Sequence, residues 1–182
     1  QAEDDFTRVE RNYVWAIGRL AEVDGEAAIY SDVRARLYMT VDEANAAYAS
    51  APEWLQSLCD AFADGLNFYL ATHPDVQPAL LERFDPWMPM YFFEGSFGGD
   101  IEQIPLGGIA EFYGEELLAQ EPVSAYRGVQ NASNGFAIAG EHTRSGDAML
   151  LINPHTSFYF RGEMQVTSEE GLSAYGAVTW GQ

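Results

Sequence analysis

The chain has 182 residues, of which 47% are hydrophobic. This is enough for one domain with a buried core, so we exclude an intrinsically disordered protein. Its 28 acidic and nine basic residues give a formal net charge of −19, and a surface of that sign repels a phosphate backbone, so we expect no nucleic-acid partner. All nine basic residues are arginine, which excludes Schiff-base chemistry and phosphate binding by lysine within this chain.

A single cysteine, Cys59, excludes an internal disulfide and a zinc site made of cysteines. No apolar run approaches the roughly 20 residues that a membrane span needs. Residues 1–5 are mostly acidic, whereas a signal peptide starts with basic residues and continues with apolar ones. We therefore expect any targeting sequence to be absent from this chain or already removed.

Helical spacing of apolar residues dominates the first part of the chain. It predicts a helix over residues 3–21, followed by a break at Asp24-Gly25. Thr40 with Glu43 three positions later is typical of a capping box and predicts the start of a second helix there.

The clearest helix is predicted after Pro52, because its apolar stripe continues without interruption until residues 72–74 read Thr-His-Pro. A further short helix is predicted over residues 78–84. Aromatic and Met residues then gather between positions 88 and 97, close to three glycines, which indicates a bend that forms the wall of a pocket. Packing within a loop is the alternative interpretation of that cluster.

Beyond residue 133 the pattern is that of β-strands. Strands over 136–139 and 148–152, joined by a turn at 143–147, predict a hairpin. Strands over 162–167 and 172–180 are expected to continue the same sheet, and residues 177–182 are interpreted as part of a strand.

Several residues that could carry chemistry have a simpler structural interpretation. Cys59 lies on the apolar stripe of the strongest helix, so we expect a buried, inert thiol. The histidines at 73, 142 and 155 lack the spacing of a metal site. The acids Glu3, Asp4, Asp5, Glu115 and Glu116 are expected to form a solvated face.

Ser133 and His155 are the exception, because a hairpin that turns near Ser145 brings together residues whose numbers add up to about 290. The two residues are therefore expected to be neighbours at the open end of the hairpin, as a nucleophile and a proton carrier or orienting group. An ordinary strand-start serine and a surface histidine would give the same spacing.

Residues 133–140 read Ser-Asn-Gly-Phe-Ala-Ile-Ala-Gly, and residues 153–155 read Asn-Pro-His. The first segment resembles the junction of the penicillin acylase family of N-terminal nucleophile hydrolases, in which a precursor cuts itself before a serine that then starts the β-subunit. The second resembles the segment at the same spacing in cephalosporin acylase-like members. Residues 1–6, Arg8, Glu10 and residues 18–20 resemble the first long helix of the α-subunit, so the resemblance covers essentially the whole chain.

The resemblance implies an α+β chain with the αββα fold of these hydrolases. It implies cleavage between Ala132, where the family often has glycine, and Ser133. The freed α-amino group, with an ordinary pKa of about 8, then serves as the base for Ser133 Oγ. Oγ attacks an amide carbonyl, the amine leaves, and water hydrolyses the acyl-enzyme. His155 is implied to orient the nucleophile or the substrate, and Asn134 helps to place the strand. The oxyanion hole is implied to come from later parts of the β-subunit.

Two weaker correspondences concern the α-subunit. Met90, Phe93 and Phe97 correspond to side chains that line the acyl pocket, which implies an apolar acyl group. Glu102 corresponds to an acid near the calcium site of penicillin G acylase, so calcium is implied as a structural ion and no cofactor is implied for catalysis.

The resemblance divides the chain into an α-subunit-like helical region with a linker, residues 1–132, and the start of a β-subunit, residues 133–182. We expect a fragment of a precursor that is inactive alone and pairs with the remainder of its own β-subunit. The predicted function is a self-processing acylase acting on an N-acylated small molecule, such as a β-lactam, a homoserine lactone or a lipopeptide. An unprocessed, non-catalytic binding protein on the same scaffold is the alternative. A periplasmic or secreted location is expected.

Overall fold

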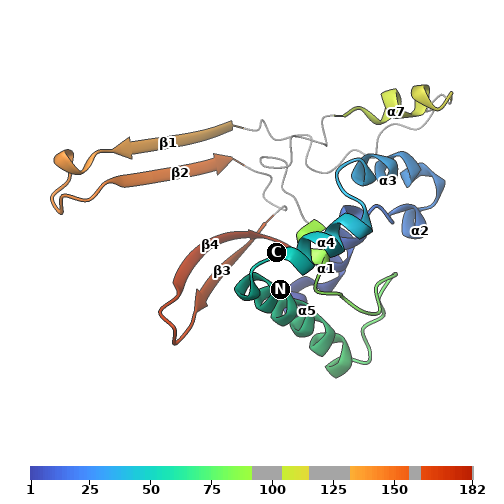
Figure 1. Ribbon diagram of the computed structural model, residues 1–182, viewed down its shortest axis with the longest axis horizontal. Coiled ribbons are helices and arrows are strands. Elements are labelled where there is room, and N and C mark those ends of the chain that lie inside the picture. Colours follow the sequence, from blue (N-terminus) through green and yellow to red (C-terminus); the bar gives the residue numbers. More distant parts are fainter. Residues whose placement is uncertain (92–103, 115–131, 156–160, 182) are drawn as a thin grey trace. The chain divides into compact units, whose positions relative to one another are not determined.

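A computed structural model describes residues 1–91, 104–114, 132–155 and 161–181, and at positions 132, 133, 154, 155 and 161 it describes the backbone only. The chain divides into two compact units (Figure 1): Gln1–Gln120 with Trp180–Gln182, and Glu121–Thr179. The described part of the first unit is helical, and that of the second consists of antiparallel strands with one 3-10 turn at Gly140–His142. The predicted α+β class is therefore confirmed. The predicted division between residues 132 and 133 stays a prediction.

The helical unit contains seven α-helices among its described residues, together with a 3-10 turn at Glu26–Ala28. They are α1 (Ala2–Ala16), α2 (Ala21–Asp24), α3 (Ile29–Arg36), α4 (Val41–Ser50), α5 (Glu53–Thr72), α6 (Met88–Tyr91) and α7 (Leu106–Phe112). Within the ranges given above, no helix is both long and apolar enough to cross a membrane.

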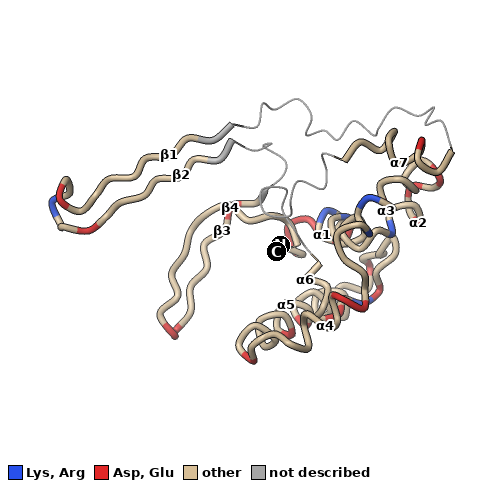
Figure 2. The backbone as a smooth tube through the Cα atoms, turned by 45° about the horizontal axis from the view of Figure 1, so that its top comes forward, with Lys and Arg blue, Asp and Glu red and all other residues tan. Residues whose placement is uncertain are grey.

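Acidic positions, red in Figure 2, recur along the helices and at the hairpin turns, whereas blue arginine positions are few. Four arginines are paired with acids of the same unit: Arg8 with Asp5 at 3.1 Å, Arg11 with Asp24 at 2.5 Å, Arg19 with Glu22 at 2.6 Å, and Arg83 with Asp85 at 3.4 Å. The Arg8 pair therefore lies within α1, and the Arg11 pair joins α1 to α2.

The acidic run at residues 3–5 is solvated only in part. Glu3 and Asp4 are exposed, as expected, but Asp5 is half-buried. Its backbone is not helical, with φ −159° and ψ 75°, and its carboxylate accepts a hydrogen bond of 3.0 Å from the backbone N–H of Arg8. Asp5 therefore marks a kink in α1 and caps the turns that follow it. Glu115 and Glu116 lie outside the described residues.

The first helix ends earlier than the sequence predicted. Its apolar stripe reaches Leu20, but α1 stops at Ala16, and Gly18 follows with φ +66°. The N–H groups of Gly18 and Arg19 donate to the carbonyls of Trp15 and Val14, which is the Schellman arrangement that a glycine in the left-handed region allows. The stop signal was therefore Gly18, which lies inside the apolar pattern.

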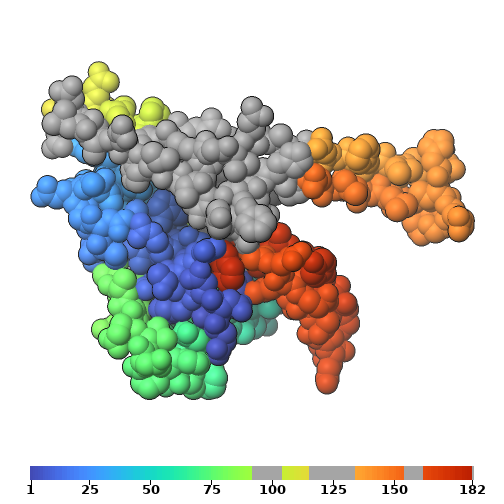
Figure 3. Space-filling model, turned by 180° about the vertical axis from the view of Figure 1, so that it is seen from behind, coloured from blue at the N-terminus to red at the C-terminus, as the bar shows by residue number. Residues whose placement is uncertain are grey.

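The core of the helical unit forms around the apolar face of α1. Its rings meet those of α5 and of the segment after α5: Phe6 stacks on Tyr69 with centroids 5.6 Å apart, and Phe84 meets the rings of Phe6 and Tyr13 edge-on at 6.1 and 5.5 Å. Such aromatic pairs add to the burial of apolar area. In the space-filling view (Figure 3) the blue atoms of the first helix and the green atoms of the later helical segments lie in contact.

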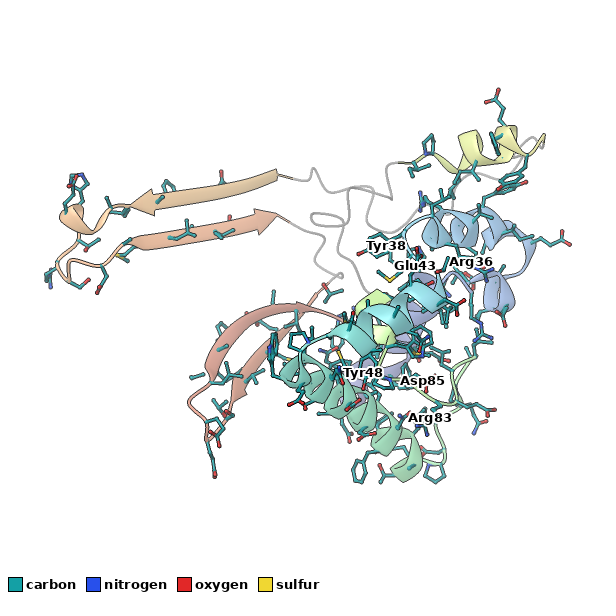
Figure 4. The ribbon with its side chains drawn as sticks, viewed as in Figure 1. Arg36, Tyr38, Glu43, Tyr48, Arg83 and Asp85 are labelled. Carbon is teal, nitrogen blue, oxygen red and sulfur yellow. The ribbon has the colours of Figure 1, made fainter. Side chains whose placement is uncertain are left out.

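Two predicted helix starts are confirmed. Thr40 Oγ1 accepts from the backbone N–H of Glu43 at 3.2 Å, and the Glu43 carboxylate accepts from the backbone N–H of Thr40 at 2.8 Å, which completes the capping box of α4 (Glu43 is labelled in Figure 4). The long helix predicted after Pro52 is α5, and it ends at Thr72 where the sequence predicted.

The predicted helix over residues 78–84 is wrong. Side chains from distant parts of the chain form hydrogen bonds with the backbone groups of this segment instead. The buried carboxylate of Glu10 accepts hydrogen bonds from the N–H groups of Ala79, Leu80 and Leu81, at 3.0, 2.8 and 2.8 Å. The side chain of Asn67 pairs with the backbone N–H and carbonyl of Phe84, both at 2.8 Å. A segment held by side chains in this way satisfies its donors without a helix.

The second unit contains two hairpins. β1 (Ala132–Ile138) pairs with β2 (Met149–His155), and β3 (Arg161–Thr167) pairs with β4 (Ser173–Thr179), each antiparallel. The sequence predicted one continuous sheet, whereas the described strands form two separate two-stranded sheets. The strand expected over residues 177–182 ends at Thr179, because Trp180 and Gly181 bond to α1.

Candidate functional site

Ser133 lies at the second position of β1, at the open end of the first hairpin. The register pairs it with Pro154, and it pairs Ala132 with His155. Ser133 and His155 are therefore one register position apart along the backbone, so the predicted neighbourhood of these two positions is present in the ladder. Their roles stay predictions, since the described part of both residues is the backbone.

The register follows from the turn that joins β1 to β2. Thr143 Oγ1 donates to the carbonyls of Gly140 and Asp147 at 3.0 and 2.8 Å, and Gly146 adopts φ +81°. A Cβ atom on Gly140 would lie 2.2 Å from the carbonyl oxygen of Gly146, so only glycine permits this approach. Because each strand residue has one partner, this turn sets the ladder in which Ser133 faces Pro154, the last residue but one of β2.

One face of the first hairpin combines two amides with apolar side chains. Asn134 pairs with Asn153, and Phe136 pairs with Leu151 two positions along on the same face. Together with Ile152 these residues line a shallow, open depression. Phe136 and Leu151 are 65% and 52% exposed, so this face offers apolar area beside amide donors and acceptors.

The predicted acyl-pocket residues belong mostly to positions that the structure does not describe. Phe93 and Phe97 lie outside the described residues, and so does the predicted calcium ligand Glu102. Met90 is half-buried at α6, with its sulfur 4.0 Å from Cys59 Sγ. Its part in an acyl pocket stays a prediction.

Cys59 is a core residue, as predicted. It is 5% exposed, and burial, with a smaller contribution from the charge of Asp60, raises the pKa of its thiol above the ordinary value. A protonated, buried thiol is a poor nucleophile. In the described ranges, no group of three or more His, Cys, Asp or Glu side chains gathers in a way that could hold a metal ion.

The sequence did not predict that two polar residues of the helical unit are buried and bind backbone N–H groups. Glu10 and Asp32 are 3% and 8% exposed. The carboxylate of Asp32 accepts from the N–H groups of Leu20 and Ala21 at 2.7 and 2.8 Å, where α2 begins. The sequence signal for such a residue is an acid on the buried side of a helical pattern. Glu10 has that placement, because it lies one position after Val9 of the apolar stripe.

Comparisons with known proteins give one match. A family model described as Penicillin amidase matches residues 1–182. No curated protein matches, and no solved structure matches. Since the match covers every residue of the chain, the chain belongs to the penicillin amidase family, which indicates an acylase or amidohydrolase activity.

Proposed function

We propose that this chain is part of a self-processing acylase in which Ser133, once it has become an N-terminus, is the nucleophile that hydrolyses an N-acyl amide. The observation that carries the proposal is the position of Ser133 in the ladder: it stands where β1 begins, one register position from His155. Family membership supports amide hydrolysis as the reaction class.

The chemistry follows from placing a base and a hydroxyl on one residue. Cleavage of the Ala132-Ser133 bond frees an α-amino group whose ordinary pKa, about 8, leaves a useful fraction neutral near pH 7. That amine takes the proton of Oγ while Oγ attacks the acyl carbonyl. The leaving amine departs with a proton, and a water molecule then attacks the acyl-enzyme and releases the acid.

The remaining parts of the proposal are positional. His155 orients Ser133 or the substrate, while Met90, Phe93 and Phe97 supply the apolar wall for the acyl group. The four-layer αββα arrangement, a structural calcium ion at Glu102 and a periplasmic or secreted location accompany this proposal.

The test is an amine-release assay with the protein expressed at its full length. Substrates are N-acyl amides whose acyl groups range from acetyl through phenylacetyl to long alkyl chains. We expect turnover to rise with apolar acyl groups, and Ser133→Ala to lower it by at least about 10³-fold. Ser57→Ala, which removes an exposed serine hydroxyl of α5, is the matched control and should leave turnover unchanged. Full activity in the Ser133→Ala protein would remove Ser133 as the nucleophile.

A further inference from the structure

Two residues that follow β4 lie on the first helix of the chain. Trp180 and Gly181 belong to the helical unit, although β4 itself belongs to the other unit. Their contacts join residues as far as 180 positions apart. In the space-filling view the red end of the chain meets the blue atoms of the first helix (Figure 3).

Three hydrogen bonds connect α1 and the residue before it to the backbone of this segment. Asn12 Nδ2 donates to the Trp180 carbonyl at 2.8 Å, and the Tyr13 hydroxyl donates to the Gly181 carbonyl at 2.5 Å. The backbone N–H of Gly181 donates to Gln1 Oε1 at 2.6 Å. Every polar backbone atom named here is thus matched by a side chain of the opposite hydrogen-bonding type.

The ring of Trp180 is held by a cation. The guanidinium of Arg8 lies over it, 5.5 Å from the ring centroid, a distance at which the cation is attracted to the π face. Arg8 is itself placed by Asp5, which accepts from its backbone N–H and pairs with its Nε at 3.1 Å. The kink at Asp5 therefore orients the arginine that covers Trp180.

Tyr13 and Gly181, which form one of these contacts, are both buried. Tyr13 is 1% exposed, and burial, followed by the charge of Cys59, raises the pKa of its hydroxyl, so the hydroxyl stays a proton donor. Gly181 is buried and adopts φ +104°, a conformation that residues with a side chain rarely adopt. The Trp180 ring packs, partly buried, against the helical core.

We propose that Gln1, Arg8, Asn12 and Tyr13, together with Trp180 and Gly181, form a clasp that fastens the chain following Ser133 to the helical unit and holds the two chains together after cleavage. We call these six residues the α1 clasp. The second half of this inference rests on the proposed function, because two chains exist only if the Ala132-Ser133 bond is cut. The partner surface is a Trp-Gly segment, recognised through its backbone and one aromatic ring.

The experiment uses the full-length protein after processing. Size-exclusion chromatography in increasing urea gives the concentration at which half of the N-terminal chain is released from the chain that begins at Ser133. Tyr13→Phe leaves the buried Gly181 carbonyl without its donor, so we expect an earlier release that corresponds to a dissociation constant raised on the order of tenfold. Arg8→Gln changes a side chain that is 35% exposed and tests the clasp without disturbing the core.

Tyr48→Phe is the matched control, since it removes a tyrosine hydroxyl of α4 that bonds to Asp60, away from the α1 clasp (Tyr48 is labelled in Figure 4). Circular dichroism at each urea concentration shows whether the helices stay folded during release. Release in both clasp variants at the same urea concentration as the wild type would overturn the clasp.

A wild-type protein that stays uncut would remove the proposed function and leave the clasp testable. In that case hydrogen exchange of the Gly181 amide is followed in the intact chain. We expect the exchange rate in Tyr13→Phe to rise on the order of tenfold over that of Tyr48→Phe, because the segment opens more often. Equal exchange rates in the two variants would overturn the clasp independently of cleavage.

Discussion

Glu10 shows how one side chain can decide the path of a distant segment. Its carboxylate is buried and accepts three backbone hydrogen bonds from consecutive residues, Ala79, Leu80 and Leu81. A carboxylate is an acceptor only and has room for all three donors, whereas an amide offers one oxygen and brings two N–H groups of its own. An acid is therefore required at position 10, because the amide N–H groups of a glutamine of the same size would face the backbone N–H groups of the segment.

We predict that Glu10→Gln lowers the free energy of unfolding by about 1–3 kcal/mol, the cost of leaving buried backbone donors unmatched. Urea unfolding followed by circular dichroism measures it. Glu22→Gln is the control, because Glu22 pairs with Arg19 on an exposed surface and should cost less than about 1 kcal/mol. Equal effects of the two substitutions would show that the Glu10 hydrogen bonds do not hold the segment.

A second prediction concerns the carboxyl of Asp24. Arg11 donates to both of its oxygens, at 3.1 and 2.5 Å, and these hydrogen bonds are the main reason that the pKa of Asp24 lies below its ordinary value. A lowered pKa means that the folded state holds the proton less tightly than the unfolded state. The pair therefore adds stability above the ordinary aspartate pKa, and this stability is lost as the pH falls through the folded-state pKa.

Arg11→Gln should raise the pKa of Asp24 toward its ordinary value, as measured by a carboxyl NMR titration. Arg19→Gln is the matched control, since it removes the hydrogen bond that lowers the pKa of Glu22 and should leave Asp24 unchanged. If Asp24 keeps its low pKa in Arg11→Gln, the guanidinium is not the cause.

Among the elements, α4 depends on its capping box. Thr40→Ala removes the acceptor for the Glu43 N–H and should lower the free energy of unfolding by about 1 kcal/mol. Thr72→Ala is the control, because its exposed hydroxyl bonds back to carbonyls in the last turn of α5 and contacts His73 Nδ1, and it caps no helix start. Thermal unfolding of the two variants separates the outcomes: a melting temperature for Thr40→Ala at or above that of Thr72→Ala would contradict the cap.

The first hairpin depends on Gly140. A methyl group there would meet the Gly146 carbonyl at 2.2 Å, so Gly140→Ala must move the turn, at a cost of about 1–3 kcal/mol, and we expect slower appearance of the chain that begins at Ser133. Gly176→Ala in β4 is the control, since a Cβ there meets nothing within 4 Å. Hydrogen exchange of the β1 amides reports the ladder. Unchanged exchange and unchanged processing in Gly140→Ala would show that the turn does not set the register.

Elements whose signals are local could be predicted from the sequence. The capping box of α4 and both ends of α5 depend on neighbouring residues, and both predictions are confirmed. The helix expected over residues 78–84 failed because its donors bond to Glu10 and its last residue bonds to Asn67, contacts that no window of sequence contains. The prediction of a strand over residues 177–182 is wrong beyond Thr179 for the same reason, since side chains of α1 form hydrogen bonds with the backbone that follows Thr179.

On the scale of the whole molecule, only the part of the site that the hairpin register determines could be predicted from the sequence. The turn near Ser145 places the backbones of Ser133 and His155 one register position apart. Such a pair can be predicted, because residues that face each other in a hairpin have numbers with a constant sum. The side-chain geometry of a nucleophile, by contrast, depends on elements distant in sequence, and the acyl-pocket and calcium predictions at Phe93, Phe97 and Glu102 fall outside the described residues. Membership of the penicillin amidase family comes from the chain as a whole.

The central claim is that Ser133 becomes an N-terminus. The measurement that tests it most directly is the intact mass of the full-length protein after expression, with N-terminal sequencing of each chain, for the wild type and for Ser133→Ala. The account predicts a wild-type chain that begins Ser-Asn-Gly-Phe and a Ser133→Ala protein that stays uncut. A folded wild-type protein that keeps the Ala132-Ser133 bond intact would contradict the account and favour an unprocessed binding protein on the same scaffold.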